Sequence, residues 1–351
     1  MTGSSFSKGP VYAVAAAVLF GASTPLAKIL LGEIDPILFA ALLYLGSGTG
    51  VLLLGRFRRP DGKAPRELRL DARDYPWLTG AILTGGVLAP ISLLYGLRAT
   101  SAATASLLLN FELVATTLIA FFIFAEFIGR RVLAAIAVIT VAGIILTWNM
   151  TGLPGFSPAS LGIVAACALW GIDNNLTRKI SGKDPLSIAV VKGMGAGGVS
   201  FLIAMLTRAA VPGFQVVVAA LIVGFVTYGL SIVFFVRALR DLGATRTSAY
   251  FASAPFIGSI ASLLLLREVP GTQFLIALPL FLLGVALLVS ERHIPGHFHE
   301  RIVHAHRHRH DELHDHPHPG EDTGEHVHEH VHEPVDHENP PAPDIHHGHE
   351  R

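Results

Sequence analysis

Three ionisable side chains lie inside long apolar stretches of the sequence: Glu112, Asp173 and Lys192. A charge at the centre of a hydrocarbon layer costs at least about 2.5 to 3.5 kcal/mol, so such a residue needs a partner, water or a function. Asp173 precedes Lys179 by six residues and Lys192 follows Pro185 by seven, so both would lie about 10 Å from the same end of consecutive helices. They could form an ion pair that fixes helix packing, or they could contact a ligand separately.

Glu112 lies nine residues into its apolar stretch, about 14 Å deep at 1.5 Å per residue. Thr116 and Thr117 follow one turn on, but no cation lies on the same stretch. We expect a functional role, because a structural one would need a partner that the sequence does not show. Asn174 and Asn175 fit helix contacts or a helix break better than ligands, although both could line a polar cavity.

The chain also carries 18 histidines, all of them beyond residue 291. Polar, acidic and proline-interrupted composition predicts that residues 291–351 form a disordered tail. Neutral imidazole binds Zn, Ni, Co and Cu, so the tail could chelate such ions; it could also sense pH near about 6.5, or be a solvated appendage. The candidate metal ligands are His304, His306, His308, His310, His314, His316, His318, His326, His328, His330, His332, His346, His347 and His349.

Motifs for catalysis are missing from the sequence. It has no G-x-S-x-G, no P-loop, no H-E-x-x-H in an apolar stretch and no basic patch with interleaved aromatics. The single cysteine, Cys167, excludes an intramolecular disulfide. We therefore expect neither an enzyme nor a nucleic-acid-binding protein, and no required cofactor.

The elements that hold these residues follow from composition. Of the 351 residues, 51% are hydrophobic and 15% charged, and the mean hydropathy is +0.54, which indicates an integral membrane protein. Runs near 20 residues suffice to cross a bilayer as helices. The predicted spans are 10–31, 36–55, 76–98, 103–125, 131–149, 159–180, 185–206, 213–236, 245–266 and 272–290.

Orientation follows from the lysines and arginines. Seven of them lie between spans two and three, which predicts that this loop, and with it both termini, is cytoplasmic. Residues 1–9 would form a short cytoplasmic N-terminus, and the first span is too long for a cleavable signal.

Several short patterns occur twice, in the same order. Phe20-Gly21 matches Trp170-Gly171 at an offset of 150, and Asp35-Pro36 matches Asp184-Pro185 at 149. The GLR at 96–98 and the ALR at 238–240 match at 142, as do Glu126 and Glu268. We infer two five-helix repeats, 10–149 and 159–290. Five is odd, so the second would be inverted relative to the first, with a substrate site between them near the midplane.

These tandem repeats, the LFGASTPLAK segment from residue 19, the YGLRATSAATASLL segment from residue 95 and the acidic positions Glu126 and Glu268 resemble the EamA branch of the drug/metabolite transporter superfamily. The resemblance covers residues 10 to 292. Lys192 and Pro255 match residues frequent in that family, whereas the first repeat has Leu43 and Leu113 there, so the two repeats would play unequal roles.

The resemblance implies an all-α, ten-helix inner-membrane carrier of a small organic metabolite, and we favour export. Substrate or coupling-ion contacts would come from Glu112, Asp173, Asn174, Asn175 and Lys192, and Glu112 could bind and release the coupling proton. Two alternatives remain: a carrier of Ni, Co or Zn, and a membrane metal sensor or buffer that transports nothing.

Overall fold

The structure is a computed structural model. It describes residues 8–57, 70–124, 129–149, 155–180, 183–242, 247 and 250–289, and the backbone of residues 297–298, 302–308, 326–332 and 336–337. The chain divides into two compact units, Met1–Glu291 and Arg292–Arg351. The first unit holds the predicted membrane spans and the second holds the histidine-rich tail.

The first half of the larger unit runs through two apolar helical stretches, then a third that contains a π-helix, then two more. Its helices are α1 (Gly9–Gly21), α2 (Ser23–Leu30), α3 (Pro36–Phe57), α4 (Tyr75–Ala81), the π-helix η1 (Ile82–Leu88), α5 (Ala89–Arg98), α6 (Ala102–Leu108), α7 (Phe111–Phe124) and α8 (Arg130–Thr147).

The second half follows a short antiparallel pair, β1 (Trp148–Asn149) with β2 (Gly155–Phe156), and repeats that order. Its helices are α9 (Pro158–Arg178), α10 (Pro185–Leu206), α11 (Phe214–Val223), the π-helix η2 (Gly224–Leu230), α12 (Ser231–Leu242), α14 (Ala254–Leu265) and α15 (Thr272–Val289). The two π-helices are 142 residues apart, which is one of the offsets seen in the sequence.

Within the described residues, eight helical stretches are long and apolar enough to cross a membrane. They match eight of the ten predicted spans. The sixth prediction falls on α9, which has the length of a span but carries polar residues near its end. The ninth falls on α14, which is apolar over 12 residues and follows a segment that is only partly described.

Capping explains why Asp-Pro occurs twice. Asp35 accepts hydrogen bonds from the backbone N–H groups of Ile37 (2.8 Å) and Leu38 (3.4 Å), and proline begins α3. Asp184 does the same at the start of α10, from Leu186 (3.2 Å) and Ser187 (3.0 Å). An aspartate cap followed by proline satisfies the free donors of a helix start, so each copy begins the second helix of its half.

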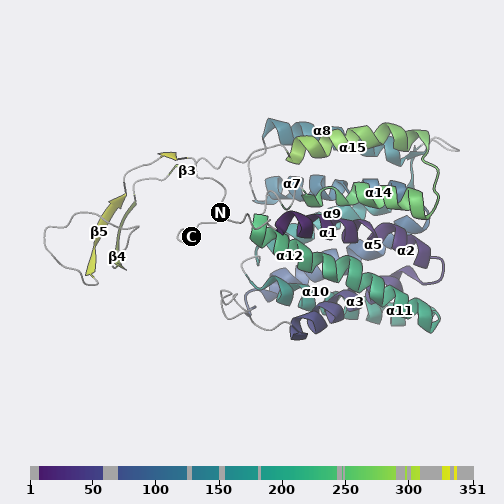
Figure 1. Cartoon of the computed structure of the whole chain (residues 1–351), viewed down its shortest axis with the longest axis horizontal. Coiled ribbons are helices and arrows are strands. Elements are labelled where there is room, and N and C mark those ends of the chain that lie inside the picture. The colour runs from purple at the N-terminus through teal and green to yellow at the C-terminus, as the bar shows by residue number, and fades with distance from the viewer. Residues whose placement is uncertain are drawn as a thin grey trace, which may run out of the picture. The chain divides into compact units, whose positions relative to one another are not determined.

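Helices pack in matching pairs from the two halves. The second helices α3 and α10 contact each other, as do the last helices α8 and α15, which lie together along one edge of the bundle (Figure 1). The first helix of each half contacts the third and fourth of the other: α1 packs on α12 and α14, and α9 packs on α5 and α7. The core of the unit is therefore built from contacts between the halves.

The repeated aromatic-glycine pair belongs to this packing. A Cβ on Gly21 would lie 2.6 Å from the carbonyl oxygen of Ala254 in α14, and one on Gly171 would lie 2.8 Å from the Cβ of Ala115 in α7. Each glycine thus lets the first helix of one half approach the fourth helix of the other.

In the tail, the backbone pairs β3 (His297–Phe298) with β6 (Asp336–His337) and β4 (Ile302–His308) with β5 (His326–His332), both antiparallel. Histidine at every second position, alternating with Val, Ala or Glu, has the two-residue period of a strand. Apart from the short pair β1–β2, the regular elements described in the larger unit are helices, in agreement with the all-α expectation.

Candidate functional site

Asp173 and Lys192 form an ion pair between α9 and α10. The Lys192 Nζ donates to Asp173 Oδ1 at 2.5 Å and also to Oδ2, and the Thr177 hydroxyl donates to Oδ1 at 3.0 Å. Asp173 is only 3% exposed. The equal depth inferred from the sequence is therefore consistent with the structure, and both charges are neutralised where they lie.

Glu112 lies at a break in its span. Helix α6 ends at Leu108 and α7 begins at Phe111, so the carboxylate sits in the first turn of a new helix, where the helix dipole favours a negative charge. A break next to an intramembrane carboxylate is typical of transporter binding sites. The sequence did not predict this break.

The partner that Glu112 lacked in the sequence comes from the other half. The Asn174 amide donates to Glu112 Oε1 at 2.9 Å and to the Thr116 hydroxyl at 3.1 Å, joining α9 to α7. Asn174 is exposed and Glu112 is half-buried, and the Asp173–Lys192 pair lies close enough to interact with Glu112 electrostatically. Glu112 is thus bonded by a neutral amide, and among the described side chains no cation bonds directly to its carboxylate.

Asn175 has a packing role. Its side-chain amide donates to the carbonyls of Thr116 (3.0 Å) and Gly171 (2.8 Å), and the residue is buried between α9 and α7. The alternative that these asparagines break the helix is wrong, because α9 continues unbroken to Arg178. Their side chains bond across the halves and leave the backbone of α9 helical.

The backbone carbonyl of Gly85, next to the ion pair, accepts hydrogen bonds from two further side chains. Gly85, in the π-helix η1, accepts hydrogen bonds from the Tyr44 hydroxyl (2.8 Å) and the Trp170 indole N–H (2.9 Å). A Cβ at Gly85 would lie 1.9 Å from Asp173 Oδ2, so only glycine lets the carboxylate lie against this turn. Sequence reasoning missed this contact; the Gly85-Gly86 pair inside an apolar span was its only signal.

Aromatic rings line the same region. The Tyr228 ring lies 5.8 Å from those of Tyr44 and Phe20, measured between centroids. Phe20 and Trp170 are the aromatic members of the repeated pair, so each half contributes one. The charged groups and these rings together offer polar and apolar contacts to an organic solute.

Two charged side chains also form hydrogen bonds with the backbone at the end of α5 and the start of α6. The Lys28 Nζ donates to the carbonyls of Leu97 (2.6 Å) and Thr100 (2.8 Å), at the end of α5. The Glu268 carboxylate accepts from the backbone N–H groups of Ala102 (2.7 Å) and Ala103 (2.8 Å), at the start of α6. One charge from the first predicted span and one from the connection after the ninth thus hold the connection between α5 and α6.

At the start of α10, Lys183 contacts Asp71 at 3.0 Å and Asp74 at 3.1 Å. The hydrogen bond from Lys183 lowers the pKa of the Asp71 carboxyl, and the same bond raises the pKa of Lys183. This pair fixes the loop before α4 to the turn between α9 and α10.

The structure does not describe the side chains of the predicted metal ligands. Seven of them have only their backbone described, in β4 and β5: His304, His306, His308, His326, His328, His330 and His332. The others lie outside the described residues altogether: His310, His314, His316, His318, His346, His347 and His349.

Comparison with known proteins agrees with the architecture. The sequence model of the EamA-like transporter family matches twice, over residues 7–149 and 157–290. An uncharacterized transporter of Methanothermobacter thermautotrophicus is 28% identical over 275 residues, which cover 74% of this chain and 80% of that protein. A protein of known crystal structure is similar with a TM-score of 0.58 and 19% identity, over 81% of this chain and 96% of its own, and it supports the fold alone. The family and the relative are transporters rather than enzymes, and since the family matches span most of the sequence, this multi-pass membrane protein belongs to the EamA-like transporter family.

Proposed function

We propose that the protein is a secondary-active exporter of a small organic metabolite, driven by the proton gradient across the inner membrane. The observation that carries this proposal is the junction of Glu112 from the first half with Asn174 from the second, beside the Asp173–Lys192 pair. Charged groups at this depth are retained where a substrate or ion must bind. Their site is formed by both halves, so movement of one half against the other would change it.

The proposed architecture is ten spans in two inverted five-span repeats. Its support is the double family match, the two π-helices at the same offset, and the reciprocal contacts of the first helix in each half with the third and fourth of the other. An odd number of spans per repeat places the second upside down in the membrane. Alternating access would then be a rocking of the halves about the site.

Glu112 is the proposed proton-binding group. As a carboxylate it accepts a hydrogen bond from Asn174 across the halves and lies at the positive end of α7. Protonation removes the negative charge that both interactions favour, which weakens the link between α7 and α9. A proton on Glu112 would therefore favour a rearrangement of the halves, and its release would restore the link.

Asp173 and Lys192 would position the site as an ion pair beside Glu112. The side chains of the proposed site are the Glu112 and Asp173 carboxyl groups, the Asn174 amide and the Lys192 ammonium group. Because no His or Cys is among them, they suit an organic solute better than a transition metal. For that reason a carrier of Ni, Co or Zn stays the second candidate. The tail would bind such ions or sense pH on the cytoplasmic side, where both termini are proposed to lie.

Reconstitution tests the proposal. We expect purified protein in liposomes to move at least one metabolite from a panel of amino acids, amines and organic acids, faster with an imposed proton gradient than without one. Protein-free liposomes, with and without the gradient, serve as controls. Movement of Ni²⁺ or Zn²⁺ with no movement of any organic solute would contradict the proposal in favour of the metal carrier.

A further inference from the structure

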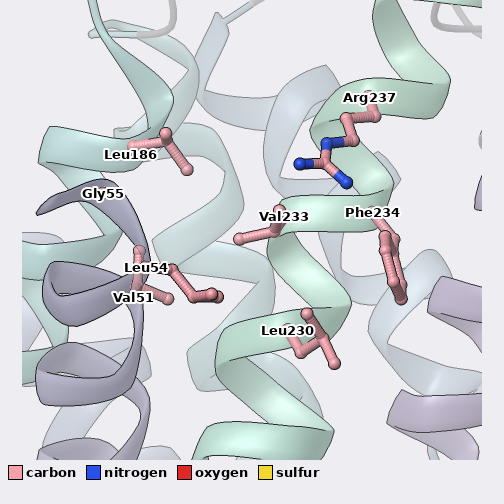
Figure 2. Close-up of a pocket in the computed structure, with 8 residues that line it drawn as sticks. All are labelled: Val51, Leu54, Gly55, Leu186, Leu230, Val233, Phe234 and Arg237. Atoms are coloured by element: carbon pink, nitrogen blue, oxygen red, sulfur yellow. The ribbon is translucent and has the colours of Figure 1, made fainter. Parts of the chain in front are cut away.

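A cavity of about 390 Å³ opens between the two halves at the start of α10 and the end of α3, and its lining residues are distinct from those of the proposed site. Figure 2 shows that its lining comes from the end of α3, the start of α10, and the consecutive helices η2 and α12. The lining residues are Val51, Leu54, Gly55, Leu186, Leu230, Val233, Phe234 and Arg237. All but the last are apolar or glycine, and Val51 and Val233 are buried.

Arg237 is the polar group of this cavity. Its guanidinium lies 5.7 Å from the ring centroid of Tyr12 and 6.0 Å from that of Phe234, and it extends from α12 toward the side on which Val233 and Leu186 lie (Figure 2). Among the side chains that the structure describes, no carboxylate forms an ion pair with it. Lys183 and Asp184, at the start of α10, are already engaged with Asp71, Asp74 and the cap of the helix.

The cavity lies at the depth of lipid headgroups and upper acyl chains. The apolar span that contains α12 ends at Phe235, so Arg237 lies just beyond the hydrocarbon. Leu230 is seven residues deeper, about 10 Å at 1.5 Å per residue. Arg56, which follows Gly55 directly, adds a second positive charge at the same level. A basic group above an apolar slot between spans matches an anionic headgroup above an acyl chain.

We infer that this cavity binds one anionic phospholipid of the cytoplasmic leaflet, with its phosphate on Arg237 and an acyl chain against Val51, Leu54 and Val233. The lipid would occupy the seam between α3 of the first half and α12 of the second. Only the choice of leaflet rests on the orientation proposed above. Binding itself is independent of transport, so it can be tested without a known substrate.

Two variants separate the headgroup contact from the acyl slot. Arg237→Gln removes the charge, and Arg131→Gln, at the exposed start of α8, is its matched control. Gly55→Phe fills the slot, since a Cβ there meets no atom within 4 Å; Gly198→Phe is its control, because Gly198 is equally open but does not line the cavity.

Native mass spectrometry of the full chain in detergent, titrated with phosphatidylglycerol or phosphatidylcholine, measures the outcome. We expect one phosphatidylglycerol to bind roughly tenfold more tightly than phosphatidylcholine, the factor for a charge-assisted contact of about 1.4 kcal/mol. Arg237→Gln should abolish that preference and Gly55→Phe should abolish the one-lipid complex, while both controls behave as wild type. Equal binding of the two lipids by wild type, or unchanged binding by Gly55→Phe, would overturn the inference. Oleate binding as tightly as phosphatidylglycerol would assign the cavity to a free carboxylate and also overturn it.

Discussion

Asp173 and Lys192 differ from Glu112 in how completely their charges are neutralised. The pair lies on two helices of the same half and is closed by direct contact, whereas Glu112 is held by an amide from the other half. Removing one member of a buried pair leaves an uncompensated charge, which costs about 3 to 5 kcal/mol in known cases. The two sets should therefore respond differently to mutation.

Each single neutralisation of the pair should be worse than both together. Asp173→Asn and Lys192→Met should each lower the thermal stability of the purified protein, and the double variant should regain most of the loss, because no unpaired charge is left. Glu33→Gln, at an exposed position, is the control. Additive losses of transport, with stability unchanged, would instead mean that each residue contacts the substrate separately.

At the residue scale the sequence pointed to the charged groups but missed part of their surroundings. The depth of Asp173 and Lys192 followed from counting residues along helices, which is a local property. That Asn174 reaches Glu112, and that Tyr44 and Trp170 share the carbonyl of Gly85, depends on which helices of the two halves are neighbours. Contacts between helices that are distant in the sequence cannot be predicted by counting residues along the chain.

At the scale of helices, the sequence predicted the interruptions least well. It indicated continuous spans, but η1 and η2 are π-helices and the fourth span is broken between α6 and α7. Apolar periodicity responds to burial and not to a change in the hydrogen-bond register, so it gave no sign of them. Each interruption frees or redirects backbone groups, and Gly85 in η1 uses its carbonyl for two side-chain bonds.

A methyl group at Gly85 should disturb the site without touching a charge. In Gly85→Ala the new Cβ would overlap Asp173 Oδ2, so the carboxylate must move away from Lys192. We expect lower thermal stability, by about 1 to 3 kcal/mol as for other overpacked interiors, and slower transport. Gly198→Ala, whose Cβ meets open space, should change neither property. Wild-type stability in Gly85→Ala would mean that this turn does not position Asp173.

At the scale of the whole molecule, duplication was the part of the fold that the sequence predicted best. The Asp-Pro caps and the aromatic-glycine contacts, read first as repeated letters, proved to perform the same task in both halves. In the tail, composition reports the lack of a core, and the alternating histidines have the two-residue period that permits the pairing of β4 with β5.

Topology can be checked with reporter fusions. A fusion after Gly62 and one after His293 should both report the cytoplasm, and one near Gly152 the periplasm, because the lysines and arginines cluster on one side. Ten spans require both ends on the same side. A periplasmic reading after His293 would contradict the count.

The tail should be separable from the carrier. A chain that ends at Glu291 retains every predicted span and intramembrane charge, so it should insert, fold and transport as the full chain does. Its binding of Ni²⁺, Zn²⁺, Co²⁺ or Cu²⁺ in calorimetry should be lost, since no histidine is left. In the full chain, binding should weaken as pH falls through about 6.5, because protons compete for the imidazole nitrogens. An isolated tail peptide that binds no metal at neutral pH would contradict both metal roles.

The central claim is that Glu112 couples transport to protons at the junction of the two halves, and Glu112→Gln tests it most directly. Glutamine keeps the shape of the side chain and an oxygen for Asn174 but cannot ionise. With a substrate found in the liposome screen, we predict that the variant folds and still exchanges substrate across the membrane, but no longer accumulates it under a proton gradient at any pH, while the control Glu33→Gln does. Accumulation by Glu112→Gln that equals wild type at every pH would contradict the account.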